Sequence, residues 1–408
     1  MAIFGHMKRF RLPAIITAMI LLVSLSVAVV PGLGHAANPD GTIDKQMKDQ
    51  FDAGSSFYQA SLTAADVDGD GQQEILVGNM NGCLYCFNSE AKPKWIARLG
   101  ASIQAAPAAK DVNNDGKMEI FVGDLNGRMW AFDSTGRVIS EWGWPKQTEN
   151  VGGFCGIFSS AAIADVNNDG ADEVIVGTYG HFIHVWTYFG AELPGWPFDN
   201  KDTIWSSPAV ADINRDGYKE IIIGADSTGN PTWPYPPGGL LYAFNFAGSI
   251  LPNWPKITPE VTWSSPAIAD VNGDGWDEIF VGTGHFYKAT GRLSSQGHTV
   301  YGYTHDGVTL PGWPVPAAGS TFSSPAIADV DGDGQREIAI ACNVVAGTGG
   351  EHIMVYRPNG QFMWDIKGFG GPMMGSPALG DITGDGLADV IIGSGVQMCA
   401  WNAGGTLL

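Results

Sequence analysis

The chain repeats one acidic nine-residue pattern seven times, and each copy leads into a short apolar run. The pattern is Asp-x-(Asp/Asn/Thr)-x-Asp-Gly-x-x-(Glu/Asp), and successive copies begin 45 to 59 residues apart. A fixed pattern at this period predicts an array of similar supersecondary units, each of which buries its apolar face against its neighbours. The copies begin at Asp66, Asp111, Asp165, Asp212, Asp270, Asp329 and Asp381.

Each copy has the composition of a calcium loop. Oxygen-bearing side chains alternate at the first, third and fifth positions, a glycine at the sixth permits a sharp turn, and an acid at the ninth closes the loop. This arrangement suits Ca²⁺, which takes about six to eight oxygen ligands, better than Mg²⁺, which demands strict octahedral geometry. Zinc is disfavoured because no Cys or His recurs in register with the loops.

We therefore expect up to seven Ca²⁺ ions. The predicted ligands are Asp66, Asp68, Asp70 and Glu74; Asp111, Asn113, Asp115 and Glu119; Asp165, Asn167, Asp169 and Glu173; Asp212, Asn214, Asp216 and Glu220; Asp270, Asn272, Asp274 and Glu278; Asp329, Asp331, Asp333 and Glu337; and Asp381, Thr383, Asp385 and Asp389. A single Asp-Gly turn is also compatible with a metal-free hairpin. The sevenfold repetition favours the metal site.

The third position separates the loops by charge. It is an acid in the first and sixth copies, an Asn in four others and Thr383 in the last. Counting carboxylates predicts the tightest calcium binding at the loops that begin at Asp66 and Asp329, and the weakest at the last loop.

Each loop is expected to join two strands of a hairpin. Apolar runs such as 75–78 and 221–224 follow the closing acid directly, whereas an EF-hand loop leads into a helix. In the fifth copy we predict strands at about 264–269, 278–282, 299–303 and 307–310. Four antiparallel strands per unit and seven units predict an all-β fold, a seven-bladed β-propeller.

The repeat resembles a known family. The stretch 324–334, Ser-Pro-Ala-Ile-Ala-Asp-Val-Asp-Gly-Asp-Gly, is similar to FG-GAP and VCBS-type repeats, which occur in the integrin α-subunit propeller and in many bacterial secreted proteins. The resemblance extends from about Asp66 to the C-terminus and implies a propeller domain over 55–408. The family includes adhesion modules, lectin-like binders and accessory domains of secreted enzymes, so the resemblance does not assign an activity.

The N-terminus indicates export. Lys8, Arg9 and Arg11 precede an apolar run over 14–30, and small residues follow at 34–36. These features predict a secretory signal peptide over 1–36 and a secreted, cell-surface or periplasmic protein, with an uncleaved membrane anchor as the alternative. Residues 37–54 precede the first unit and are the candidate for a ring-closing outer strand of the last blade.

The acidity of the chain is explained mainly by the loops. Removal of residues 1–36 changes the formal net charge from −20 to −23, because the segment carries three basic residues and no acid. The predicted ligands include 23 of the 42 acidic residues. Nucleic acid is disfavoured as a partner because only 22 Lys and Arg occur in the chain. We expect a monomeric ring.

A ligand face is predicted at the end of the blades opposite the loops. The residue seven positions before the first Asp is aromatic in four consecutive copies, and some connections between second and third strands are long there. The candidate ligand-binding residues are Phe158, Trp205, Trp233, Tyr235, Trp263, Phe286, Tyr287 and Phe322. The alternative is that the aromatics pack between neighbouring blades.

These observations predict a binding or adhesion module for a glycan or a protein. The alternative is a polysaccharide-active lyase or hydrolase, or an accessory subunit of one, since some secreted glycan-cleaving proteins resemble this repeat. Catalysis would need an acid and a base apart from the loops. Residues of the required type near the predicted face are Asp226, Glu260, His285 and Glu351, but they match no nucleophile motif.

Overall fold

The computed structural model describes residues 62–227, 234–284, 297–342, 352–367, 375–394 and 397–408. Within these ranges the chain forms 27 β-strands and one short 3₁₀ helix, η1 (Ser140–Trp142). The strands make six four-stranded sheets and one three-stranded sheet. None of the described helical segments has the length and hydropathy required to cross a membrane.

The seven sheets, here called blades 1 to 7, follow one another along the chain. Blade 1 contains β1 (Thr63–Ala65), β2 (Glu74–Gly78), β3 (Cys83–Phe87) and β4 (Pro93–Arg98); blade 2 contains β5 (Ala108–Lys110), β6 (Glu119–Gly123), β7 (Arg128–Phe132) and β8 (Lys146–Gln147); blade 3 contains β9 (Ala162–Ala164), β10 (Glu173–Gly177), β11 (Phe182–Thr187) and β12 (Phe198–Asp199); blade 4 contains β13 (Ala209–Ala211), β14 (Glu220–Ser227), β15 (Gly238–Phe244) and β16 (Lys256–Thr258). Blade 5 contains β17 (Ala267–Ala269), β18 (Glu278–Gly282), β19 (Thr299–Tyr303) and β20 (Val315–Pro316); blade 6 contains β21 (Ala326–Ala328), β22 (Glu337–Cys342), β23 (His352–Tyr356) and β24 (Phe362–Lys367); blade 7 contains β25 (Ala378–Gly380), β26 (Asp389–Ser394) and β27 (Gln397–Trp401).

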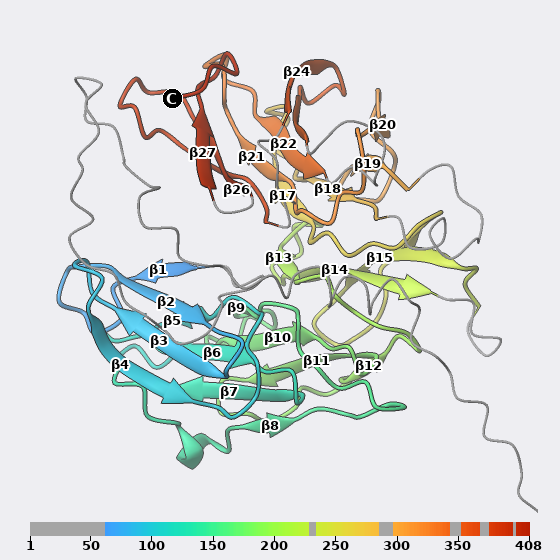
Figure 1. The fold of residues 1–408 in the computed structure, drawn as a ribbon. Coiled ribbons are helices and arrows are strands. Elements are labelled where there is room, and N and C mark those ends of the chain that lie inside the picture. The colour runs from blue at the N-terminus through green and yellow to red at the C-terminus, as the bar shows by residue number, and fades with distance from the viewer. Residues whose placement is uncertain (1–61, 228–233, 285–296, 343–351, 368–374, 395–396) are drawn as a thin grey trace, which may run out of the picture.

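Each blade is an antiparallel meander in which neighbours in sequence are neighbours in the sheet. The first strands contact one another in succession, from β1 and β5 through β9, β13, β17 and β21 to β25. The innermost strands therefore lie side by side around one centre, and the sheets extend outward from them (Figure 1). This is the arrangement of a seven-bladed propeller.

The core lies between the blades. All five residues of β10 are buried, and Ile175 and Val185 of blade 3 belong to the same apolar cluster as Ile221 and Ile223 of blade 4. The second and third strands read as continuous apolar runs because neighbouring blades cover both of their faces. The second strand of blade 1 ends at Gly78, where an added Cβ would lie only 2.2 Å from Ile103 of blade 2. This close approach excludes any larger residue at position 78.

Paired serines before the first strands join the blades. The first serine of a pair acts within its own blade: Ser264 Oγ accepts the Gly282 N–H at 3.1 Å. The second acts between blades: Ser265 Oγ accepts the Ser207 N–H of blade 4 at 2.9 Å. The inter-blade bond recurs from blade 2 to blade 7, with Ser160, Ser207, Ser265, Ser324 and Ser376 as the acceptors.

The predicted strands of blade 5 need two corrections. The first strand is only Ala267–Ala269, because the serines before it bond through their side chains and Pro266 lacks an N–H. The segment predicted as the fourth strand, 307–310, forms only an isolated bridge between Tyr303 and Thr309. The fourth strand is instead β20, which follows Trp313.

The last blade departs from four strands. In the described part of the chain it contains three, followed by an isolated bridge between Trp401 and Leu407. The predicted signal peptide 1–36 and the predicted ring-closing segment 37–54 lie outside the described residues.

Candidate functional site

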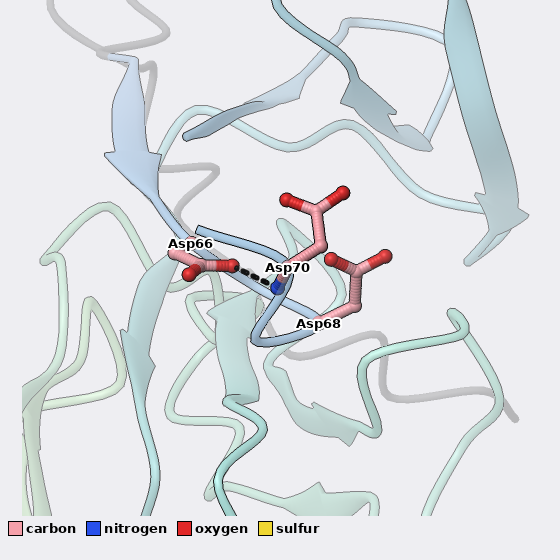
Figure 2. A group of neighbouring side chains, drawn as sticks. All are labelled: Asp66, Asp68 and Asp70. Atoms are coloured by element: carbon pink, nitrogen blue, oxygen red, sulfur yellow. Dashed lines mark hydrogen bonds between the residues drawn. The ribbon is translucent and has the colours of Figure 1, made fainter. Parts of the chain in front are cut away.

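The seven acidic loops connect the first strand of each blade to the second. Figure 2 shows the loop of blade 1, with the carboxylates of Asp68 and Asp70 beside each other and Asp66 turned toward the loop backbone. Asp66 Oδ1 accepts the N–H groups of Gly69 at 2.9 Å and Asp70 at 3.0 Å, and Oδ2 accepts that of Gly71 at 2.8 Å. The first acid thus fixes the turn.

The sixth-position glycine has a backbone conformation that other residues rarely adopt. Its φ angle lies between 84° and 90° in all seven loops, from Gly71 in the first to Gly386 in the last. In this region glycine carries no Cβ penalty. The conserved geometry of the loops therefore follows directly from the repeated Asp-Gly.

The closing acid is buried in every loop, with at most 3 % of its surface exposed. One of its oxygens accepts a backbone N–H from the second loop position, as Glu119 Oε2 does from Val112 at 3.2 Å. Burial, opposed by this hydrogen bond and reinforced by Asp115 and Asp111, raises the pKa of Glu119 to about 7. The pKa values of Glu173, Glu220 and Glu278 are likewise raised to about 7, with burial as the main cause.

The donor set fits a hard cation. Carboxylate oxygens of Asp66, Asp68 and Asp70 lie within 4.8 Å of one another, and so do those of Asp329, Asp331 and Asp333. Among the described residues, Asp68 Oδ1, Glu337 Oε1 and Asp389 Oδ1 are buried without a hydrogen-bond partner. Buried carboxylate oxygens without donors are costly, and a calcium ion would satisfy them.

The third-position amides point into the loops. Asn113 Nδ2 donates to Glu119 Oε1 at 3.0 Å, and Asn167, Asn214 and Asn272 make the equivalent bond at 3.0 to 3.4 Å. In these four loops the amide N–H group thus binds Oε1 of the closing Glu, the oxygen that does not accept the backbone N–H. A bound ion would require the amide to present its oxygen instead.

Sequence reasoning missed two basic residues in the four-carboxylate loops. Lys94 Nζ lies 3.0 Å from Glu74 Oε1 and also binds Asp68. Arg357 binds Asp331 Oδ2 at 2.6 Å and Asp333 Oδ2 at 2.9 Å. Neither residue belongs to the repeated pattern, so only the fold brings them to the loops.

At the opposite end of the blades, four predicted ligand-face residues form one stack. Because the loops join the ends of the first strands to the second, residues before the first strands lie at the other end of the sheets. The centroid of the Phe158 ring lies 4.3 Å from that of Trp205, Trp205 lies 5.0 Å from Trp263, and Trp263 lies 5.1 Å from Phe322, with interplanar angles of 24° to 28°. We call these four rings the aromatic ladder.

Most ring faces of the aromatic ladder are covered by a neighbouring ring of the ladder. Trp205 and Trp263 each stack on a ring from both adjacent blades, and all four rings are half-buried. Tyr179 contacts Phe158 and Trp205 edge-on. Inter-blade packing, the alternative in the sequence interpretation, therefore accounts for the faces, and the ring edges remain for a ligand.

The other predicted ligand-face residues do not join the ladder in the described structure. Tyr235 is half-buried against the apolar cluster shared by blades 3 and 4. Trp233, Phe286 and Tyr287 lie outside the described residues, as do the candidate catalytic residues His285 and Glu351.

An acidic cluster adjoins the ladder. Asp226 Oδ2 accepts the Trp263 indole N–H at 2.7 Å and the Thr203 hydroxyl at 2.8 Å, while Asp226 Oδ1 has no hydrogen-bond partner among the described residues. Burial, followed by the negative charge of Asp202 and to a lesser extent Glu260, raises the pKa of Asp226 well above its ordinary value, and its two hydrogen bonds oppose this shift. Asp226 therefore holds its proton more tightly than an exposed carboxyl group does.

Comparison with protein families identifies the repeat. Residues 111–176 and 165–223 match the family described as FG-GAP-like repeat, and residues 262–301 match the FG-GAP repeat. These stretches contain the loops of blades 2 to 5. Blades 2 to 5 of this β-propeller therefore carry FG-GAP-type repeats.

The first blade of the propeller matches a different family. Residues 42–101 are similar to the family described as lambda-carrageenase beta-propeller domain. No sequence among the curated proteins matches the chain.

Solved structures support the propeller fold. The biofilm matrix protein Bap1 of V. cholerae is 14% identical with a TM-score of 0.57, and the match covers 86% of this chain and 79% of Bap1. BBS1N, from its complex with ARL6DN, is 14% identical with a TM-score of 0.54, covering 87% and 92% of the two chains. Quinohemoprotein alcohol dehydrogenase from Comamonas testosteroni is 12% identical with a TM-score of 0.58, covering 85% and 66%. At these identities the similarity concerns the fold alone.

Proposed function

We propose that this FG-GAP propeller is an exported, calcium-binding recognition module for a glycan or a protein ligand. The observation that carries the proposal is the aromatic ladder, which extends over four blades beside the buried Asp226. Half-buried Trp and Tyr side chains offer large contact area together with polar groups, a combination typical of ligand sites. The propeller functions as a monomeric ring with no nucleic-acid partner.

Two similar proteins favour a polysaccharide setting. One matched family is named for the propeller of a λ-carrageenase, and one similar structure is a biofilm matrix protein. Because the ladder uses its ring faces internally, a ligand would contact the ring edges, together with Tyr179 and polar groups nearby. Calcium in the loops at the other end of the blades would hold the hairpins on which this surface depends.

A binding screen tests this function. The calcium-loaded protein would be titrated with a panel of polysaccharides that includes λ-carrageenan, and the double variant Trp205→Ala/Trp263→Ala would be compared with Trp142→Ala. Trp142 is a half-buried indole that contacts Tyr188 and Phe189, away from the ladder. If the ladder is central, the double variant should lose more than about 2 kcal/mol of binding free energy, and Trp142→Ala should lose little. A folded double variant that binds normally would remove the ligand site from the ladder.

A second function is favoured by Asp226. The raised pKa of Asp226 and the nearby carboxyl group of Asp202 make a pair of acids of the kind that glycoside cleavage uses, with one to protonate the leaving oxygen and one to act as base. Product analysis of any polysaccharide that binds would distinguish an enzyme from a binding module. New reducing ends or unsaturated products that disappear in Asp226→Asn, with binding retained, would indicate the enzyme; binding without products indicates the module.

A further inference from the structure

The loop of blade 1 contains a basic side chain of its own chain. Lys94, on β4, lies on the oxygens of the third and ninth loop positions, Asp68 Oδ2 and Glu74 Oε1, and its Nζ is 3.8 Å from Asp70 Oδ2. These are oxygens that would coordinate calcium. An ammonium group at hydrogen-bond distance from them and a calcium ion bound to them cannot occupy the loop together.

The loop of blade 6 also binds a basic side chain, which comes from a different position in the blade. Arg357 follows β23, at the turn between the third and fourth strands, whereas Lys94 lies on a fourth strand. Its guanidinium binds Asp331 and Asp333 and comes within 3.8 Å of Glu337 Oε1, which remains buried without a hydrogen bond. The two basic residues thus reach equivalent carboxylates by different routes.

Lys94 and Arg357 contact the two loops that have an acid at the third position. Loops 1 and 6 carry four ligand carboxylates, and the other five carry three, with Asn or Thr at the third position. Within the described residues, no Lys, Arg or His forms an ion pair with a ligand position of those five loops; the ion pairs of ligand positions are those of Lys94 and Arg357. When only the ligand positions are counted together with Lys94 and Arg357, each loop carries three negative charges.

We propose that Lys94 and Arg357 are tethered counter-cations that compete with calcium for loops 1 and 6. The inference rests on the proposed calcium function of the loops. It reverses the order of calcium affinities that counting carboxylates predicts. A calcium ion entering loop 1 or loop 6 must displace a bound cation, whereas one entering a loop with Asn at the third position displaces none. It also makes loops 1 and 6 the two that keep their geometry without calcium.

The side chains can move out of the loops. The side chains of Lys94 and Arg357 are 28% and 31% exposed. Long basic side chains can keep their stems packed while the charged end turns to solvent. Loops 1 and 6 therefore alternate between a self-neutralised form and a calcium form, and the calcium concentration sets the balance.

Substitution of Lys94 tests the competition. In Lys94→Met, calcium calorimetry should show one site at least about tenfold tighter than in the wild type, since an opposing charge is removed. The melting temperature should fall in excess EDTA, where four carboxylates face one another, but not in excess calcium. The matched control is Lys117→Met, which removes the same charge from an exposed lysine in loop 2 that forms no ion pair with its carboxylates in the described structure. Arg357→Met repeats the test in blade 6, and its control is Arg336→Met, since Arg336 is an exposed residue of the same loop that forms no ion pair in the described structure.

A second variant separates competition from a structural role. Lys94→Met/Asp68→Asn converts loop 1 into an Asn loop and should recover the melting temperature in EDTA while keeping the tighter calcium site. A merely structural Lys94 would instead lower the melting temperature equally in EDTA and in calcium, which would overturn the inference. Unchanged or weaker calcium binding in Lys94→Met would also overturn it. If the wild type itself bound no calcium, the proposed calcium function would fail first.

Discussion

At the scale of single residues, Trp263 has two separable roles. Its ring stacks between Trp205 and Phe322, and its indole N–H is one of two donors to Asp226 Oδ2. Phe at this position would keep an aromatic ring in the ladder but remove the donor, whereas Ala would remove both.

We expect Trp263→Ala to lower the free energy of unfolding by about 2 to 4 kcal/mol and Trp263→Phe by about 1 to 2 kcal/mol. The larger loss reflects a cavity between two stacked rings, and the smaller one reflects the lost hydrogen bond. Urea unfolding of both variants in saturating calcium would measure the difference. Equal losses would mean that the ladder contributes little to the stability of the ring.

His184 provides a pH-dependent contact between blade 3 and the segment before it. Its side chain is buried, lies between Glu149 at 2.9 Å and Glu192 at 3.2 Å, and stacks on Trp186. Burial alone would lower the pKa of His184, but the hydrogen bonds and charges of Glu149 and Glu192 outweigh it and raise the pKa. A raised pKa means that the folded protein binds the proton more tightly than the unfolded chain.

The stabilisation by His184 should therefore be complete below about pH 6.5, the unfolded value, and disappear as pH rises through the higher folded value. We predict that wild type melts above His184→Gln at about pH 6 and that the difference narrows by about pH 9. Constant calcium keeps the loop contribution common to both proteins. A difference that is independent of pH would show that His184 acts through packing alone.

At the scale of elements, the paired serines explain how small innermost strands hold together. β17 pairs with β18 over only three residues, from Ala267 opposite Phe280 to Ala269 opposite Glu278. The hydroxyls of Ser264 and Ser265 extend this pairing, one within the blade and one to blade 4. A first strand is thus held by serine hydroxyl acceptors as well as by its backbone hydrogen bonds to the second strand.

Ser265→Ala should lower the free energy of unfolding by about 1 kcal/mol, because the Ser207 N–H loses its acceptor between two blades. Ser249→Ala is the control, since Ser249 is an exposed turn residue. Thermal unfolding of the two variants would be compared in calcium. If both variants melt at the same temperature, the inter-blade hydrogen bond makes no measurable contribution to the free energy of unfolding.

The sequence predicts some elements much better than others. The second and third strands of blade 5, predicted over 278–282 and 299–303, match β18 and β19. They can be predicted because the repeated loop marks where the hairpin begins. The fourth strand, β20, spans only Val315–Pro316 and carries too little pattern to be found. The prediction at 307–310 mistook a turn for a strand.

Some residues of the candidate sites can likewise be predicted from the sequence, and others cannot. Loop ligands are adjacent in sequence, so their residue types and spacing suffice to predict them. Lys94 reaches its loop from β4 and Arg357 reaches its loop from the turn after β23, and Asp226 of blade 4 meets Trp263 of blade 5. Contacts of this kind depend on how neighbouring blades pack together and leave no local signal in the sequence.

At the scale of the whole molecule, seven loops with net negative charge lie at one end of the blades. Their closing acids are buried, and the pKa values of four of them are raised to about 7, so the ion-free fold carries the cost of keeping carboxylates out of water. Neutralisation of these loops by calcium would remove that cost in several blades at once. We therefore expect calcium to stabilise the ring as a whole.

Thermal melting of the purified protein with and without calcium tests this account most directly. Calcium at about 1 mM over sites of about 0.1 mM affinity contributes about 1.4 kcal/mol for each occupied site. Because several sites act together, the account predicts a melting temperature in excess EDTA that is more than about ten degrees below the value in calcium. The same melting temperature in EDTA and in calcium would contradict it.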